Sequence, residues 1–279
     1  MKLLLCAICW LICNAALAQQ QVTVPSLDQR DGQPLPLTGH WLPVRTDKPA
    51  PALILLHGCG GAFDKQGQLD QRMQTYSALL NAEGWHVLVL DSLNPRGVRE
   101  LCTQKIGTRS ITMTQRRRDT IGALAWLAGR PEVDPARLAL LGWSNGGSAV
   151  LASTNLNHAE VKNASFRPKA AVAFYPGCVA DLKRGYAPDT HLLMLSGDAD
   201  DWTAAAPCES LAQQSAPPKP TFVVYPGAYH GFDSNAPVRI RAEVPNGVNP
   251  GRGVHVGGQP EAMQLSRQQM LTFLREHLR

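Results

Sequence analysis

The sequence predicts an α/β protein with a mostly parallel central sheet that is flanked by helices on both faces. Short apolar runs of strand length alternate along the chain with amphipathic segments of helix length, which is typical of strand–helix–strand crossovers. The chain of 279 residues is long enough for one such domain with a sizeable core. It contains no internal repeat and no low-complexity tract.

The expected strands and helices follow one another along the chain. Early strands around Val22 to Val24 and His40 to Val44 are expected to form an antiparallel lead-in. Further strands are expected at Ala52–Leu56, Trp85–Leu90, Leu138–Leu141, Ala170–Tyr175, His191–Leu195 and Thr221–Tyr225. Helices are expected at Leu69–Glu83, closed by Gly84 in the C-cap position, at Thr114–Ala128, from Ser144 to about Leu156, and at Glu261–Leu278. Asp134–Arg137 is expected to be a turn, and Asn235–Gly258 one long irregular loop.

The first eighteen residues have the pattern of a secretory signal peptide. A basic residue is followed by an apolar run from Leu3 to Leu17, and an Ala-x-Ala site ends at Ala18. The run is short for a membrane span of roughly 20 residues, and the bulky Ile12 before Cys13 disfavours a lipoprotein site. We therefore expect cleavage after Ala18, no stable membrane anchor, and a single periplasmic or secreted domain over residues 19–279.

The charge pattern gives no indication of a nucleic-acid partner. The formal net charge is +5, and the basic residues are scattered except for the run Arg116-Arg117-Arg118 in a predicted helix. A solvated helix face explains this run better than a nucleic-acid patch does. One of the three arginines is alternatively expected to pair with Asp119 or with a neighbouring loop.

Cysteine usage indicates disulfides and no metal site. After the expected signal peptide the chain retains Cys59, Cys102, Cys178 and Cys208. An even number in an exported protein favours two disulfides, and four cysteines allow three pairings. They form no Cys-x-x-Cys pair and no cluster with histidines, so we expect neither a zinc site nor a cofactor.

A glycine-rich turn follows the strand expected at Leu138–Leu141. Its sequence, Gly142-Trp143-Ser144-Asn145-Gly146-Gly147, has the Gly-x-Ser-x-Gly form of a nucleophile elbow, in which a serine stands on a sharp turn between a strand and a helix. Gly142 and Gly146 supply room where side chains would collide. The pattern alone is weak, and its meaning depends on whether a base and an acid follow it.

A serine nucleophile needs a base, and the base needs an orienting acid. His230 follows the strand expected at Thr221–Tyr225, whereas His40, His158 and His255 lack a comparable position after the elbow at a strand end. Asp198, Asp200 and Asp201 all follow the strand expected at His191–Leu195. We expect Ser144, Asp200 and His230 to form a catalytic triad, with Asp198 and Asp201 as alternative acids.

Backbone N–H groups are expected to stabilise the oxyanion that forms when the serine attacks a carbonyl. One should come from Asn145, directly after the nucleophile. The second is expected from the glycine-rich loop Leu56–Gly61, whose glycines allow close approach of the backbone to a substrate. Cys59 is the expected donor in this loop, and Gly60 is the alternative.

Five motifs of this chain match one known family: Leu-His-Gly-Cys-Gly-Gly (Leu56–Gly61), the elbow with its preceding strand (Asp134–Gly147), Phe-Tyr-Pro-Gly-Cys (Phe174–Cys178), Gly-Asp-Ala-Asp-Asp-Trp-Thr (Gly197–Thr203) and Tyr-His-Gly-Phe (Tyr229–Phe232). The chain resembles the dienelactone hydrolase family of the α/β-hydrolase superfamily. The resemblance spans most of residues 19–279 and implies an α/β-hydrolase fold. The Gly-x-x-Asp pattern of the family supports Asp200 as the acid.

The chain differs from the enzymes that gave the family its name in its expected location and at the nucleophile. The enzymes that gave the family its name carry cysteine there and are cytoplasmic, whereas this chain has Ser144 and an expected signal peptide. The resemblance therefore implies a hydrolase of carboxylic esters or lactones more broadly, and not hydrolysis of dienelactone itself.

The expected strand ends also suggest how the cysteines pair. Cys178 and Cys208 follow two neighbouring strands, and Cys59 and Cys102 lie in loops after two other strands. We expect the disulfides Cys59–Cys102 and Cys178–Cys208, both at the rim of the active site.

Together these features predict a serine-dependent hydrolase that forms an acyl-enzyme on a small-molecule ester or lactone, without metal or cofactor. A peptidase or an acyltransferase using the same triad is the alternative, and a non-catalytic binding protein on the same fold is a third. Four side chains are candidates for the pocket lining or for packing around it: Arg96, Tyr175, Trp202 and Phe232. The sequence carries no signal for an oligomeric state.

Overall fold

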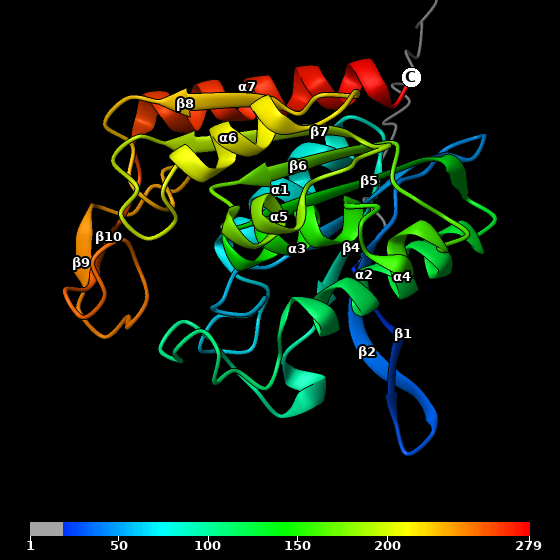
Figure 1. The fold of residues 1–279 in the computed structure, drawn as a ribbon. Coiled ribbons are helices and arrows are strands. Elements are labelled where there is room, and N and C mark those ends of the chain that lie inside the picture. The colour runs from blue at the N-terminus through cyan, green and yellow to red at the C-terminus, as the bar shows by residue number, and fades with distance from the viewer. Residues whose placement is uncertain (1–18) are drawn as a thin grey trace, which may run out of the picture.

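The computed structural model describes residues 19–279, so the signal peptide expected at residues 1–18 lies outside the described part of the chain. An eight-stranded sheet with the strand order β1-β2-β4-β3-β5-β6-β7-β8 forms the centre of the molecule (Figure 1). β1 pairs antiparallel with β2, and β2 with β4, while the remaining neighbours are parallel. The expected mostly parallel α/β architecture, including its antiparallel lead-in, is confirmed.

The strands and helices have the following bounds. The large sheet contains β1 (Gln20–Arg30), β2 (Gln33–Leu42), β3 (Ala50–Leu56), β4 (His86–Asp91), β5 (Val133–Trp143), β6 (Ala170–Phe174), β7 (His191–Gly197) and β8 (Thr221–Tyr225), and a second, two-stranded sheet contains β9 (Arg239–Arg241) and β10 (Val254–Val256). The helices are α1 (Gln71–Ala82), η1 (Asn94–Arg96), α2 (Met113–Ala128), α3 (Asn145–Thr154), α4 (Ala159–Lys162), α5 (Val179–Arg184), α6 (Ala206–Gln214) and α7 (Pro260–His277).

The apolar strands are buried because helices cover both faces of the sheet. Every residue of β3, β4 and β6 is buried, as expected for parallel strands between two helical layers. Successive side chains of β3 alternate between the two core clusters: Ile54 packs with residues of α2 and α3, whereas Leu53 packs with residues of α1 and α7. This arrangement leaves the carboxyl ends of the parallel strands free of covering helices, and their loops build the candidate site.

Local structure differs from the sequence-based expectation in several places. The helices η1, α4, α5 and α6 were not expected. Residues 235–258, expected to be irregular throughout, contain the antiparallel pair β9 and β10, because strands of three residues are too short to show a period. Asp134–Arg137, expected to be a turn, belongs to the start of β5, where the pairing with β3 shifts register.

Within residues 19–279, no helix is long and apolar enough to cross a membrane.

The arginine run in α2 is also placed differently from the expectation of a solvated face. Arg116 and Arg117 are buried, and only Arg118 is substantially exposed. Arg117 and Arg118 both pair with Glu160 of α4, at 2.7 Å each. The run is therefore a packing surface of the helix and not a basic patch.

Candidate active site

Ser144 stands on the turn between β5 and α3, with a strained backbone. Its φ of 54° lies in a region that residues with a side chain rarely adopt, which is the geometry of a nucleophile elbow. A Cβ on Gly142 would lie 2.3 Å from the carbonyl oxygen of Gly146, and a Cβ on Gly146 would lie 1.9 Å from that of Leu56. Both positions therefore require glycine for the elbow to pack against the end of β3.

The loops after β7 and β8 bring an acid to a histidine. The Nδ1 atom of His230 lies 2.8 Å from Oδ2 of Asp200, and both residues are buried. The other carboxylate oxygen of Asp200 accepts hydrogen bonds from the amides of Trp202 and Thr203 at 2.8 and 2.9 Å. A Cβ on Gly197 would lie 1.9 Å from the carbonyl oxygen of Ala228, so the two loops can approach this closely only with glycine there.

The environment keeps the Asp200 carboxyl ionised. Burial acts to raise its pKa and is the largest single influence, but the charge of His230 and the hydrogen bonds from His230, Thr203 and Trp202 outweigh it. The pKa of Asp200 is therefore lower than the usual value of 3.8. An ionised carboxylate at Nδ1 fixes the tautomer of the imidazole, leaving Nε2 free to accept a proton.

The two neighbouring aspartates are occupied elsewhere. Asp198 accepts a hydrogen bond from the amide of Gly227 at 2.7 Å. Asp201 accepts from the backbone amide of His255 at 2.8 Å and lies 2.7 Å from its Nδ1. Of the three aspartates considered from the sequence, Asp200 is the one whose carboxylate contacts His230.

Thr203 is a site residue that the sequence did not reveal. Its hydroxyl lies 3.0 Å from Oδ2 of Asp200, 3.1 Å from Nδ1 of His230 and 3.0 Å from the carbonyl oxygen of Tyr175. It therefore connects the acid and the base with the end of β6. Its position three residues after Asp200, within the Gly197–Thr203 motif, is the only signal that could have indicated it.

Two aromatic rings contact the imidazole of His230. The ring centroids of Tyr175 and Trp202 lie 4.5 and 4.6 Å from that of His230. Tyr175 is buried and donates its hydroxyl to Asp233 at 2.7 Å, and Asp233 in turn pairs with Arg72. These contacts restrict the orientation of the histidine ring.

The glycine-rich loop after β3 lies against the elbow. A Cβ on Gly58 would lie 3.7 Å from Cβ of Ser144. The carbonyl oxygen of Cys59 accepts a hydrogen bond from the amide of Leu101 at 2.7 Å. Among the hydrogen bonds of residues 19–279, none is donated by the amide of Cys59 or of Asn145. Both amides next to the serine are thus available to a ligand.

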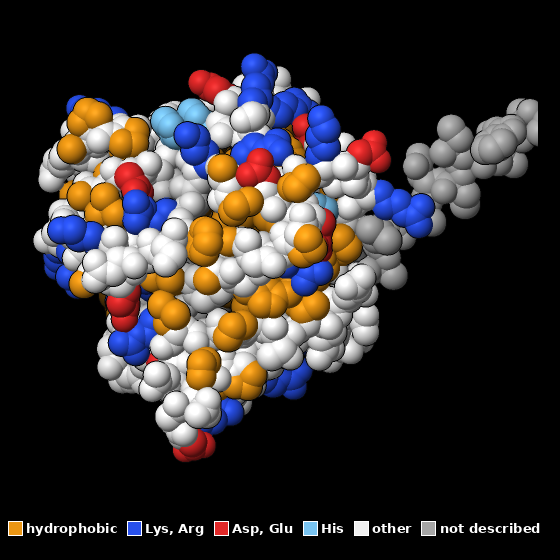
Figure 2. All heavy atoms as spheres, turned by 90° about the vertical axis from the view of Figure 1, so that its right-hand side faces the viewer, with side chains coloured by type: hydrophobic (Ala, Val, Ile, Leu, Met, Phe, Trp, Pro, Cys, Tyr) orange, Lys and Arg blue, Asp and Glu red, His pale blue; other side chains and the backbone are white. Residues whose placement is uncertain are grey.

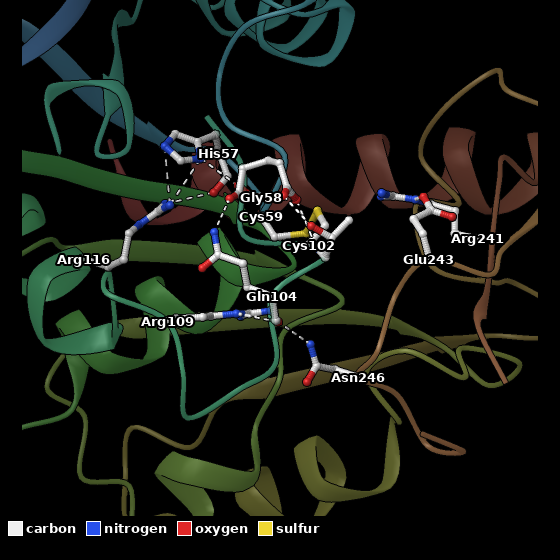
Figure 3. Close-up of a disulfide and its surroundings, with 12 residues drawn as sticks. His57, Gly58, Cys59, Cys102, Gln104, Arg109, Arg116, Arg241, Glu243 and Asn246 are labelled. Carbon is white, nitrogen blue, oxygen red and sulfur yellow. Dashed lines mark hydrogen bonds and ion pairs between the residues drawn. A yellow bond between two sulfur atoms is a disulfide. The ribbon is translucent and has the colours of Figure 1, made fainter. Parts of the chain in front are cut away.

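Two disulfides connect the loops around this edge of the sheet. Cys59 is bonded to Cys102, and Cys178 to Cys208, which is the pairing expected from the strand ends. The first disulfide links the glycine-rich loop to the long loop after β4 (Figure 3). The second links the start of α5 to α6.

Residues 235–258, here called the rim segment, cross from the loop after β4 to the loop that carries Asp200. Asn246 accepts a hydrogen bond from the amide of Ile106 at 2.9 Å and donates to the carbonyl of Gln104 at 2.8 Å (Figure 3). The guanidinium of Arg241 lies 5.5 Å from the ring centroid of Trp202. β9 and β10 lie at the same end of the molecule as the carboxyl ends of β6 to β8 (Figure 1).

The pocket-lining candidates separate into two groups. Tyr175 and Phe232 are buried, so they pack around the site and do not line an open pocket. Arg96 binds Asp119 and Asp28, at 2.8 and 3.0 Å, and does not face His230. Trp202 is the candidate that is only partly buried and also contacts the imidazole, so it is available to line a pocket.

Two open clefts lie away from Ser144. One of about 370 Å³ is lined by residues such as Pro51, Trp85 and Arg275, and another of about 310 Å³ by residues such as Pro135 and Lys169. These residues lie at or near the amino ends of the parallel strands or at the end of α7. The amino ends of β6 to β8 lie on the right of Figure 1, the side that faces the viewer in Figure 2. Within residues 19–279, no group of three or more His, Cys, Asp or Glu side chains is arranged to hold a metal ion.

The sheet topology and the elbow define an α/β-hydrolase fold. Residues 41–278 match the model of the dienelactone hydrolase family, and the chain belongs to this family. Among proteins of known sequence, the chain is 26% identical over 207 residues to acylamino-acid-releasing enzyme 2 of Oryza sativa subsp. japonica. That match covers 72% of this chain but only 23% of the rice protein, so the chain spans about a quarter of the relative's length.

Solved structures show the same fold at low sequence identity. The dienelactone hydrolase of Anabaena variabilis ATCC 29413 is 16% identical, with a TM-score of 0.62 over 94% of this chain and 99% of that chain. A dienelactone hydrolase-like promiscuous phosphotriesterase from metagenomic libraries is 18% identical, with a TM-score of 0.62 over 93% of this chain and 99% of that chain. At such identities the likeness establishes the fold alone.

Proposed function

We propose that this protein is a serine-dependent hydrolase of carboxylic esters or lactones, with Ser144 as nucleophile, His230 as general base and Asp200 as the orienting acid. The observation that carries the proposal is the buried 2.8 Å contact between Asp200 and His230, at strand ends of the same sheet that presents Ser144 on its elbow. Membership of the dienelactone hydrolase family supports hydrolase chemistry. Because this chain has serine where the enzymes that named the family have cysteine, we do not propose dienelactone as its substrate.

In this mechanism Ser144 attacks the carbonyl carbon while Nε2 of His230 takes the hydroxyl proton. Asp200 stabilises the imidazolium that forms. The amides of Cys59 and Asn145 bind the oxyanion of the tetrahedral intermediate. As the intermediate collapses, His230 returns the proton to the leaving alcohol, or to the ring oxygen of a lactone, and an acyl-enzyme remains. Water, deprotonated by His230, then releases the acid and restores Ser144.

The proposal is tested with p-nitrophenyl acetate and butyrate. We expect turnover by the wild type, loss of turnover in Ser144→Ala, and a covalent adduct on Ser144 after treatment with a fluorophosphonate probe. Ser153→Ala is a matched control, since Ser153 is a buried serine of the same helix and its hydroxyl has no partner among the described residues. Full esterase activity in Ser144→Ala would rule the proposal out.

A peptidase is the second candidate, because the rice relative is an acylamino-acid-releasing enzyme. The two candidates share the triad and differ in the leaving group, which is an amine for a peptide and an alcohol for an ester. Hydrolysis of an N-acetylated amino-acid p-nitroanilide at a kcat/KM comparable to that for the p-nitrophenyl ester would favour the peptidase. Product analysis with added alcohol would reveal transfer of the acyl group.

We further propose that the protein is exported and that residues 1–18 are removed, leaving one domain over residues 19–279. Two disulfides at the candidate site support an oxidising compartment. Mass spectrometry of the protein isolated from periplasm and culture medium tests this proposal. An N-terminus at Gln19 is expected, and recovery only of the full-length chain from the cytosol would contradict it.

A further inference from the structure

Two buried side chains hold the backbone just before Cys59. Nδ1 of His57 lies 2.7 Å from the carbonyl oxygen of Gly58. Nη2 of Arg116 donates to the carbonyl oxygen of His57 at 2.9 Å (Figure 3). Both side chains are fully buried. The carbonyls of three consecutive residues are thus engaged, since that of Cys59 accepts from Leu101.

The hydrogen bonds of His57 define its protonation. Nδ1 must carry the proton, because its 2.7 Å partner is a carbonyl oxygen, and Nε2 must be the acceptor, because the amide of Ser92 points at it from 3.3 Å. The ring is therefore neutral. Burial, followed by the nearby charge of Arg116, lowers the pKa of His57 well below its usual value and keeps it so.

Arg116 is unusual because it is a buried guanidinium that, among the described residues, makes no hydrogen bond to a carboxylate. Its contacts are the carbonyl and the ring of His57, with Nη1 at 3.2 and 3.4 Å from the two ring nitrogens. Its Nε atom has no partner among the described residues. Burial lowers the pKa of Arg116 to about 10, so it is still charged at neutral pH. An apolar side chain would fill such a position at lower cost.

The geometry of the peptide unit indicates what these contacts accomplish. In a trans peptide the C=O and N–H groups point in opposite directions. The carbonyl of Gly58 and the amide of Cys59 belong to the same peptide, so the bond from His57 to the carbonyl directs the amide away from His57. Gly58, at one end of this peptide, lies beside Ser144, since a Cβ added to Gly58 would come within 3.7 Å of Cβ of Ser144.

We propose that Arg116 and His57 are positioning residues, which orient the Gly58–Cys59 peptide so that its N–H binds the oxyanion formed on Ser144. This inference rests on the proposed serine mechanism and deepens it. Arg116 acts through His57: it donates to the carbonyl oxygen of His57, one peptide earlier, and its Nη1 lies 3.2 Å from Nδ1 of the ring that binds the carbonyl of Gly58. It thereby fixes the histidine that orients the donor.

The decisive variants remove one contact at a time. Arg116→Met removes the charge and the fork but keeps the length of the side chain. His57→Leu removes the ring donor, whereas His57→Asn keeps an N–H donor at the position of Nδ1. Arg117→Met is the matched control, since Arg117 is the next buried arginine of α2 but binds Glu160 of α4.

For p-nitrophenyl butyrate we expect Arg116→Met and His57→Leu to lower kcat by about 10- to 100-fold with KM changed less than about twofold, because removal of one oxyanion donor typically costs 10²- to 10³-fold. His57→Asn should restore most of kcat. A trifluoromethyl ketone, whose adduct with Ser144 carries an oxyanion, should bind more weakly by the same factor as kcat/KM falls. Arg117→Met should leave kcat and ketone affinity unchanged.

Four outcomes overturn the inference: a folded Arg116→Met variant with kcat within about twofold of wild type; equal losses in Arg116→Met and Arg117→Met; a fall in thermal stability without loss of ketone affinity; and no rescue by His57→Asn. If Arg116→Met does not fold, Arg116→Lys, which removes the fork but keeps the charge, and His57→Leu test the orientation of the peptide. Ser144→Ala, assayed in parallel, separates the two proposals. Activity in Ser144→Ala refutes the serine mechanism. If Ser144→Ala is inactive but the Arg116 and His57 variants keep the kcat of the wild type, only the positioning role is refuted.

Discussion

The carboxylate of Asp201 binds both the backbone amide and Nδ1 of His255, at 2.8 and 2.7 Å. This contact joins the rim segment to the loop that carries the candidate acid, directly after Asp200. Two successive aspartates thus bind two different histidines. Asp200 contacts His230, whereas Asp201 binds the rim segment, so variants of the two aspartates should differ in their kinetics.

Replacement of each aspartate by asparagine should separate these roles. Asp200→Asn is expected to lower kcat by about 10³- to 10⁴-fold, because an amide cannot fix the required tautomer or stabilise the imidazolium. Asp201→Asn should raise KM while kcat changes less than about threefold, because it loosens the rim but leaves the pair of Asp200 and His230 intact. Steady-state kinetics with p-nitrophenyl butyrate distinguishes the two effects.

Asp198→Asn is the control for this series, since Asp198 is exposed and its carboxylate binds, within residues 19–279, the amide of Gly227 alone. Wild-type kinetics is expected for it. A larger loss of kcat in Asp201→Asn than in Asp200→Asn would show that the wrong aspartate has been assigned.

The main features of the fold were readable from the sequence because they depend on local patterns. Apolar runs such as Leu53 to Leu56 identify buried strands, and the glycines of the elbow mark the sharp turn after β5. The positions of Asp200 and His230 after two expected strands also predict their contact, which the structure shows at 2.8 Å. Each of these features depends on a short segment or on the order of such segments along the chain.

The tertiary partners of Arg116, Arg117 and His255 were not readable. Arg116 and Arg117 look like a solvated face because their partners, His57 and Glu160, lie about 40 to 60 residues away along the chain. The same applies to His255, whose partner Asp201 is 54 residues distant. A charged side chain can be buried when a distant segment supplies hydrogen bonds. The hydrophobic periodicity of the sequence does not indicate such a partner.

The two disulfides should differ in their effect on activity more than in their effect on stability. They close separations of 43 and 30 residues, for which the loop-entropy relation gives a similar loss of about 4 kcal/mol each on removal. Only Cys59 belongs to the loop beside Ser144. We therefore expect Cys59→Ser/Cys102→Ser to lower kcat about tenfold or more, beyond the effect of Cys178→Ser/Cys208→Ser, because a mobile donor is less well oriented.

This comparison requires urea denaturation curves and kcat for both double variants, with activity measured where each remains folded. Reduction of the wild type with dithiothreitol breaks both disulfides and should therefore lower kcat at least as much as Cys59→Ser/Cys102→Ser does. Identical kcat for the two folded variants would show that the first disulfide has no part in shaping the candidate oxyanion site.

Asp233 is expected to make stability depend on acidic pH. Burial acts to raise its pKa, but the charge and hydrogen bonds of Arg72 and the hydroxyl of Tyr175 hold the pKa below the usual 3.8. A carboxyl whose folded-state pKa is depressed adds stability that is complete above its unfolded-state pKa and is lost as pH falls through the folded-state value. The contribution should therefore be constant from pH 5 upward and decline below about pH 4.

Asp233→Asn tests this dependence. At pH 7 we expect a loss of about 2–4 kcal/mol of unfolding free energy, because Arg72 is left without its buried partner but remains partly exposed. The difference from wild type should shrink as pH falls below about 4, where the wild-type carboxyl also becomes neutral. Denaturation curves between pH 3 and 7 measure it, and a difference that grows toward low pH would contradict the assignment.

The hydroxyl of Thr203 should matter for turnover although it does not touch the substrate in the proposed mechanism. It lies within 3.1 Å of both the acid and the base, and it bonds to the carbonyl of Tyr175 at 3.0 Å. Thr203→Val keeps the shape of the side chain but loses these contacts. We expect kcat to fall about tenfold with little change in KM, as for the loss of one hydrogen bond to a charged group. Thr203→Ser should restore kcat, since it returns the hydroxyl without the methyl group. A wild-type kcat in Thr203→Val would mean that the hydroxyl has no part in turnover, and that Asp200 alone suffices to orient His230.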